Sequence, residues 1–237
     1  MRLLPTLLLA LVPTTAHAQE RTQYVLAINW QPAFCETRPD RPECETQTGE
    51  RFDASHFALH GLWPQPRSRD YCGVDADTVR LDEQGDWNRL PAPELSAALA
   101  DDLTIAMPGT QSGLDRHEWI KHGTCYEGVA EEYFADSLAM LDAINSSEVA
   151  ALFAGATGTE ITQDAVRDAF DSAFGAGAGE RVRLACVEDG DRRLVSELTI
   201  GLTGDIDGPE SFSDRILDAR PTGGGCNGGF VDPVGLQ

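Results

Sequence analysis

Six cysteines spread along this chain, and they restrict its possible folds more than any other feature of the sequence. They follow a stretch, residues 1–18, with the pattern of a secretory signal peptide: Arg2 precedes an apolar run, and Ala16-His17-Ala18 forms a small-x-small cleavage site. In an exported chain, six cysteines predict three disulfides, for which fifteen pairings are possible. No CxxC pair occurs, which argues against a structural zinc ribbon. The cysteines are Cys35, Cys44, Cys72, Cys125, Cys186 and Cys226.

The chain is strongly acidic. It carries 18 basic residues against 39 acidic ones, a formal net charge of −21. Such a charge argues against a protein that grips nucleic acid through a broad basic face, but it leaves room for an enzyme with a small, locally positive site. The sequence leaves the reason for the acidity open: solubility, life in salt, an acidic working pH or short substrates would each fit.

The order of the expected elements predicts an α+β domain with a central antiparallel sheet and flanking helices. Strands are predicted near 24–28, 55–63, 181–186 and 194–202, and helices near 95–105, 115–124, 129–144, 147–153 and 162–174. Strands from both ends of the chain flank a helical middle, which suits an antiparallel sheet better than βαβ units. Residues 31–54 and 65–93 are predicted as loops. Asp115 is predicted to be the N-cap of the helix at 115–124. Without an internal repeat or linker, residues 19–237 are expected to form one soluble domain.

Histidine is scarce, and three of the four histidines beyond the leader fall in two short segments. The first segment is Leu59-His60-Gly61-Leu62-Trp63-Pro64, and the second is His117-Glu118-Trp119-Ile120-Lys121-His122-Gly123-Thr124-Cys125. On a helix at about 100° per residue, the histidines, the glutamate and the lysine of the second segment fall within one arc. A solvated face is the plainer interpretation, but a surface built for solubility uses Lys and Glu rather than paired histidines.

A zinc site is one alternative for this helix. Its string resembles HExxH, in which two histidines four residues apart bind zinc. Here the fourth residue after His117 is Lys121, and the second histidine comes one residue later. An ammonium group beside a zinc ion is electrostatically unfavourable. We therefore expect no metal site here. The alternative is an exported metal-binding protein, which would be distinguished by the effect of a chelator on its activity.

Two imidazoles, a carboxylate and an ammonium group suit a reaction through an anionic transition state. Imidazoles titrate near neutral pH, so one can accept a proton while another donates it. Lysine supplies positive charge where negative charge develops. Displacement at phosphorus is such a reaction, and RNA carries its own nucleophile in the ribose 2′-OH. The residues permit this chemistry without selecting it uniquely.

In these two segments the chain closely resembles the ribonuclease T2 family of secreted acid endoribonucleases. The segments match the two signatures of that family, in the same order and about sixty residues apart. Residues 24–35, with Asn29-Trp30-Gln31-Pro32, are similar to the family's first strand and following turn. The resemblance implies a ribonuclease T2-like α+β fold stapled by disulfides. It also implies cleavage of single-stranded RNA in two steps, transphosphorylation to a 2′,3′-cyclic phosphate and hydrolysis to a 3′-phosphate.

The resemblance also assigns catalytic roles. It makes His122 the general base on the 2′-OH and His60 the general acid for the leaving oxygen. Glu118 and Lys121 would stabilise the pentacovalent phosphorane, and His117 would bind phosphate.

Other positions are assigned to substrate contact or structure. By the same resemblance, Trp63 would stack on a base, and Tyr71 is a further candidate for that pocket. His56 matches no catalytic position and is expected to be structural. Gln65 stands where other family members can carry an acid, which leaves the base preference open.

The resemblance favours the disulfides Cys35–Cys44, Cys72–Cys125 and Cys186–Cys226. It implies an enzyme without a cofactor or a metal, whose partner is single-stranded RNA rather than DNA or a membrane. It also implies a monomer with a secreted or periplasmic location. The alternative is a catalytically inactive family member that acts as a secreted binding or defence protein. All five polar residues expected for catalysis are nevertheless present.

Overall fold

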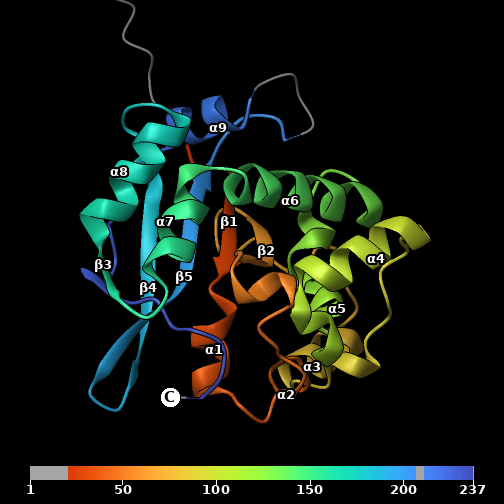
Figure 1. Cartoon of the computed structure of the whole chain (residues 1–237). Helices are drawn as coiled ribbons and strands as arrows, with labels where there is room; N and C mark the ends of the chain where they lie inside the picture. Colours follow the sequence, from red (N-terminus) through yellow and green to blue (C-terminus); the bar gives the residue numbers. More distant parts are fainter. Residues whose placement is uncertain (1–20, 207–210, 237) are drawn as a thin grey trace, which may run out of the picture.

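The computed structural model describes residues 21–206 and 211–236, so the predicted signal peptide at 1–18 lies outside the described residues. In the described part, helices surround one mainly antiparallel sheet (Figure 1). The strand order is β2-β1-β5-β6-β3, with β4 paired to β5. The strands are β1 (Tyr24–Asn29), β2 (Ala58–Pro64), β3 (Glu160–Thr162), β4 (Val182–Asp189), β5 (Arg192–Leu202) and β6 (Gly228–Phe230). This is the predicted α+β class.

The helices pack against both ends of the strand order. Helices α5 and α6 contact β2, and α8 contacts β3. Figure 1 shows α3, α4 and α5 gathered beyond β2, on the far side from α8. The helices are α1 (Gln31–Thr37), α2 (Pro42–Glu45), α3 (Ala76–Glu83), α4 (Ala97–Ala106), α5 (Leu114–Lys121), α6 (Ala130–Asn145), α7 (Glu148–Ala156), α8 (Gln163–Phe174) and α9 (Phe212–Asp218).

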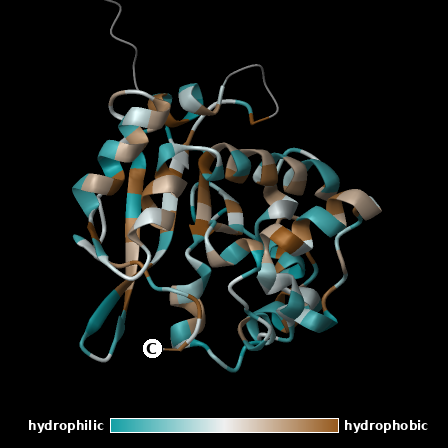
Figure 2. Cartoon of the chain, in the orientation of Figure 1, coloured by the Kyte–Doolittle hydropathy of each residue, from teal (hydrophilic) through white to brown (hydrophobic). Residues whose placement is uncertain are grey.

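Strand β1 lies at the centre of the core. Leu26, Ala27 and Ile28 are completely buried, because β1 is paired on both edges and covered on both faces. A strand covered on both faces has a continuous apolar run rather than an alternating one, as this sequence does. Figure 2 shows the hydrophobic residues concentrated on the central strands, whereas the free end of the β4–β5 hairpin is hydrophilic. Most of the apolar stripe predicted for 129–144 is also buried, but Leu138 is half-buried and Val129, the N-cap of α6, is 59% exposed.

Two segments predicted as loops contain helices. Within 31–54, α1 and α2 each begin with a proline in the first two positions, where the missing N–H costs nothing. Within 65–93, Asp75 caps α3 by accepting hydrogen bonds from the backbone N–H groups of Asp77 and Thr78. Proline and aspartate therefore mark helix starts here as well as loops.

The N-cap predicted for the helix at 115–124 was wrong. Helix α5 begins at Leu114, so Asp115 lies inside its first turn, and Gly113 is the N-cap with a φ of 80°. Only glycine adopts this left-handed conformation without strain. A Cβ at Gly113 would in addition lie 3.0 Å from the carbonyl carbon of Trp87.

Three disulfides fasten the loops to this frame. They are Cys35–Cys44, Cys72–Cys125 and Cys186–Cys226, the pairs that the family resemblance favours. The second joins the loop after β2 to the segment that follows α5, and so links the two histidine segments. Among the described residues, no helix is long and apolar enough to cross a membrane.

Candidate active site

His60 owes its position to an irregularity in strand β2. Along the β1–β2 pairing, Ala27 lies opposite Gly61 and Ile28 lies opposite Leu59, so His60 is the extra residue of a β-bulge. A bulge turns one side chain out of the regular alternation, and bulges occur often beside active sites. The His60 ring reaches across β1 to β5, where its Nδ1–H donates to Glu197 Oε2 at 2.7 Å.

Helix α5 supplies the other imidazoles, and it ends between them. His117 lies in the last two turns, Lys121 is the last residue, and His122 is the C-cap. The chain then turns sharply at Gly123, where a Cβ would lie 2.3 Å from the Trp119 ring. The glycine after the second histidine is therefore needed for the close packing of this turn.

Glu118 lies between the two histidine segments and is 1% exposed. Its Oε2 accepts a hydrogen bond from the Trp63 indole N–H at 2.9 Å, and its Oε1 lies 3.6 Å from His60 Nε2 and 3.9 Å from His117 Nε2. The carboxylate packs so closely on β2 that a Cβ at Gly61 would lie 2.0 Å from Oε2. Glycine at this position therefore makes room for the carboxylate.

One cavity of about 350 Å³ brings the predicted catalytic residues together. Its lining includes the five polar residues that the resemblance singled out, and also Trp63 and Arg67. Lys121 has no carboxylate within ion-pair distance among the residues that the structure describes, so its charge is available to a ligand. The lining residues are His60, Trp63, Pro64, Gln65, Arg67, Asp70, His117, Glu118, Lys121 and His122.

The aromatic residues predicted to bind a base have protein partners. The Trp63 ring lies edge-on to His60, with 5.2 Å between ring centroids, and is tilted against His122 at 5.7 Å. Its N–H is used by Glu118. Tyr71 lines a neighbouring cavity and donates its hydroxyl to Asp82 Oδ2 at 2.7 Å. Both aromatic side chains therefore hold charged residues of the site in place.

Sequence reasoning missed three residues that orient the histidines. Asp82 is buried and accepts a hydrogen bond of 2.6 Å from His117 Nδ1–H, and Trp87 stacks on the same ring with 4.3 Å between centroids. Glu197 holds His60 in the corresponding way. Asp82 lies in helix α3 and Glu197 in strand β5, and neither acid stands in a recognisable motif. A single sequence gives no signal for them, because their histidine partners lie 35 and 137 positions away.

The surroundings of the two candidate acid–base histidines shift their pKa values in opposite directions. Burial lowers the pKa of His60, but the hydrogen bond to Glu197 and the charges of Glu118 and Glu197 outweigh it, so the pKa is raised above 6.5. Burial lowers the pKa of His122 to about 3, and the positive charges of Lys121, His117 and His60 act in the same direction. Burial also raises the pKa of the Glu118 carboxyl.

His56, predicted to be structural, lies outside this cavity. It stacks on Phe52, with 4.5 Å between ring centroids, and its Nδ1–H donates to the backbone carbonyl of the same residue. Among the described residues, no group of three or more His, Cys, Asp or Glu is placed to hold a metal ion.

Comparison with known proteins places this geometry in a family. Residues 21–212 match the model of the Ribonuclease T2 family. Ribonuclease I of Escherichia coli (strain K12) is 30% identical over 231 residues, covering 88% of this chain and 85% of the relative. Extracellular ribonuclease LE of Solanum lycopersicum is 28% identical over 152 residues, 62% of each chain. The crystal structure of RNase NT in complex with 5′-AMP has the same fold, with a TM-score of 0.55 at 20% identity over 91% of this chain and 99% of that one.

Proposed function

The chain belongs to the ribonuclease T2 family and is a T2-type endoribonuclease, and from this premise we propose that it cleaves single-stranded RNA through a pair of histidines with divided roles. In the first step His122 takes the proton of the 2′-OH, and the 2′-oxygen attacks phosphorus. The bond to the leaving 5′-oxygen breaks as His60 donates its proton to that oxygen. In the second step His60 takes a proton from water, and His122 returns its proton to the 2′-oxygen.

The opposite pKa shifts of these two histidines carry the proposal. A general base must be neutral and a general acid protonated at the working pH. With a pKa of about 3, His122 is neutral over most of the acidic range, whereas the raised pKa keeps His60 protonated toward neutral pH. Titratable groups whose surroundings separate their pKa values reveal the acid and the base. The order agrees with the roles inferred for the family.

The remaining polar residues face the phosphate. Lys121 and His117 line the cavity from α5 and would neutralise its oxygens. Glu118 would contribute through its charge, which raises the pKa of His60 and keeps that acid protonated beside the phosphorane. No role in this scheme requires a metal.

Digestion of a homopolymer panel tests the proposal. Single-stranded homopolymers should yield first 2′,3′-cyclic and then 3′-phosphate ends, separable by chromatography, and EDTA should leave the rate unchanged. Duplex RNA should be cut much more slowly, because the attacking 2′-oxygen must line up opposite the leaving oxygen. Absence of cleavage in every homopolymer would favour the alternative, an inactive binding or defence protein. Chelator-sensitive cleavage would exclude the metal-independent scheme.

Replacement of Glu197 by Gln should move the alkaline fall in kcat/KM to lower pH. The glutamate raises the pKa of His60, so without its charge the acid loses its proton earlier as pH rises. Glu118 still raises this pKa in the variant, and Lys121 and burial still lower it. At acidic pH, His60 is protonated in both the parent protein and the variant, so their values of kcat/KM should converge there. A pH profile of kcat/KM on a dinucleotide measures the change.

The matched control for this profile is Glu188→Gln, which removes an exposed carboxylate from the neighbouring strand β4. Its alkaline limb should coincide with that of the parent protein. If the limb of Glu197→Gln also stays in place, Glu197 does not set the proton affinity of His60.

We further propose that the protein works outside the cytoplasm, in the periplasm or medium. The leader pattern of residues 1–18 and the three disulfides support this location. One relative is named an extracellular ribonuclease. N-terminal sequencing of the exported protein should begin at Gln19, and recovery of an uncleaved chain would contradict the proposal.

A further inference from the structure

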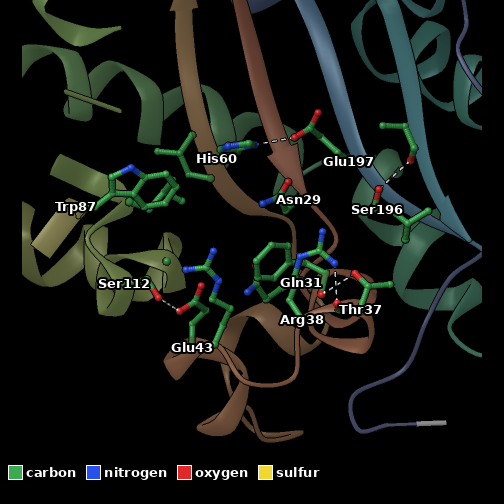
Figure 3. A pocket seen from close by; sticks show the side chains of 17 residues that line it. Asn29, Gln31, Thr37, Arg38, Glu43, His60, Trp87, Ser112, Ser196 and Glu197 are labelled. Atoms are coloured by element: carbon green, nitrogen blue, oxygen red, sulfur yellow. Dashed lines mark hydrogen bonds and ion pairs between the residues drawn. The ribbon is translucent and has the colours of Figure 1, made fainter. Parts of the chain in front are cut away.

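A second cavity, of about 280 Å³, adjoins His60 on the side of the ring that faces Glu197. The catalytic cavity lies on the other side, where Nε2 faces Glu118. Figure 3 shows His60 and Glu197 at one end of the second cavity and Arg38 at the other, with Trp87 on a side wall. Arg41 also lines this cavity. A ligand that extends past His60 would therefore meet two guanidinium groups.

These two arginines are not neutralised by the protein. Neither Arg38 nor Arg41 has a carboxylate within ion-pair distance among residues 21–206 and 211–236, and Arg38 donates only to the backbone carbonyl of Thr37. Some arginines of this acidic chain are held by carboxylates, for example Arg51 by Asp53, whereas the guanidinium charges of Arg38 and Arg41 are available to a ligand.

The segment that carries the two arginines is held in place. It joins α1 to α2, and the Cys35–Cys44 disulfide closes it into a short loop. The carboxylate at this end of the cavity, Glu43, is buried and accepts a hydrogen bond from the Ser112 hydroxyl. Guanidinium groups suit phosphate because their planar fork donates two hydrogen bonds to its oxygens.

We propose that Arg38 and Arg41 bind the phosphate that follows the leaving nucleotide of the RNA. The inference rests on the proposed function, because it takes His60 as the acid at the leaving 5′-oxygen. In this proposal the nucleoside that carries the leaving oxygen occupies the second cavity, on the far side of His60 from the attacked phosphorus. The 3′-phosphate of that nucleoside then reaches Arg38 and Arg41. The enzyme accordingly favours substrates that continue beyond the cleaved bond.

Two dinucleotides that differ in one phosphate test this subsite. One ends in a free 3′-hydroxyl, and the other carries a 3′-phosphate; both contain the same bond to be cleaved. In low salt, the parent protein should cleave the phosphorylated substrate with a kcat/KM about tenfold higher. In Arg38→Gln/Arg41→Gln the ratio between the two substrates should fall to about one. Because the ratio is taken within one protein, it does not depend on the active fraction.

The control is Arg183→Gln/Arg220→Gln, which removes the same charge from exposed arginines that line neither cavity. It should keep the tenfold ratio. If this control loses the preference for the phosphorylated dinucleotide equally, the effect is one of long-range charge and the proposed subsite is wrong. The subsite is also wrong if the parent protein shows no preference, or if Arg38→Gln/Arg41→Gln retains it. If the parent cleaves neither substrate, the proposed function itself fails.

Discussion

Replacement of His60 or His122 by Phe should lower kcat/KM on RNA by about 10²–10⁴-fold each while the protein stays folded. Phenylalanine keeps the volume of the ring but can neither donate nor accept a proton. Steady-state rates on a dinucleotide measure the loss, and thermal unfolding checks the fold. Appreciable turnover by either variant would overturn the assignment of the pair. His56→Phe is a matched control, because His56 packs on Phe52 outside the cavity and its replacement should leave the rate nearly unchanged.

A substrate with an activated leaving group separates the two roles. A nucleoside 3′-(4-nitrophenyl phosphate) expels nitrophenolate, which departs without a proton, so the general acid is no longer needed. His60→Phe should therefore recover most of its lost rate on this substrate, whereas His122→Phe should remain as impaired as on RNA because the substrate's 2′-OH still needs a base. The opposite pattern would exchange the two roles.

Replacement of Gly61 by Ala should lower kcat/KM by about 10²-fold although no catalytic group is removed. The new Cβ would lie 2.0 Å from Glu118 Oε2 and 2.9 Å from the Trp63 indole nitrogen. The carboxylate must then leave its place beside His60, and a displacement of about 1 Å in an active site can cost this much. Steady-state kinetics and thermal unfolding of the variant measure both consequences. Gly49→Ala, with nothing within 4 Å of the new Cβ, should be silent.

A second substitution distinguishes steric displacement from a general backbone defect. If the clash with the carboxylate destabilises Gly61→Ala, then Glu118→Ala should remove most of that destabilisation in the double variant, because the carboxylate atoms at 2.0 Å and 2.6 Å are gone and only the Trp63 contact at 2.9 Å remains. Activity should stay low, since the carboxylate is absent. Strictly additive losses of unfolding free energy would show that Gly61 is required for another reason.

Much of the frame was predictable because its signal is local. The apolar runs of β1 and β5 and the periodic stripe of α6 each indicate their element from residues close in sequence. Helices α1 and α3 were missed because their segments are short and rich in proline, glycine and aspartate. Those residues start helices as readily as they form loops, and only packing against the rest of the chain decides which.

The sequence by itself determined which chemical groups are available: three histidines, a glutamate and a lysine in two signature segments, and glycines at positions where a side chain would collide. Only the tertiary structure decided how those groups behave. The bulge at His60 turns its ring toward Glu197, 137 residues away, and the end of α5 places His122, half-buried, beside Lys121. A pKa depends on burial and on the charges nearby in space. The direction of proton flow is therefore a property of the folded chain.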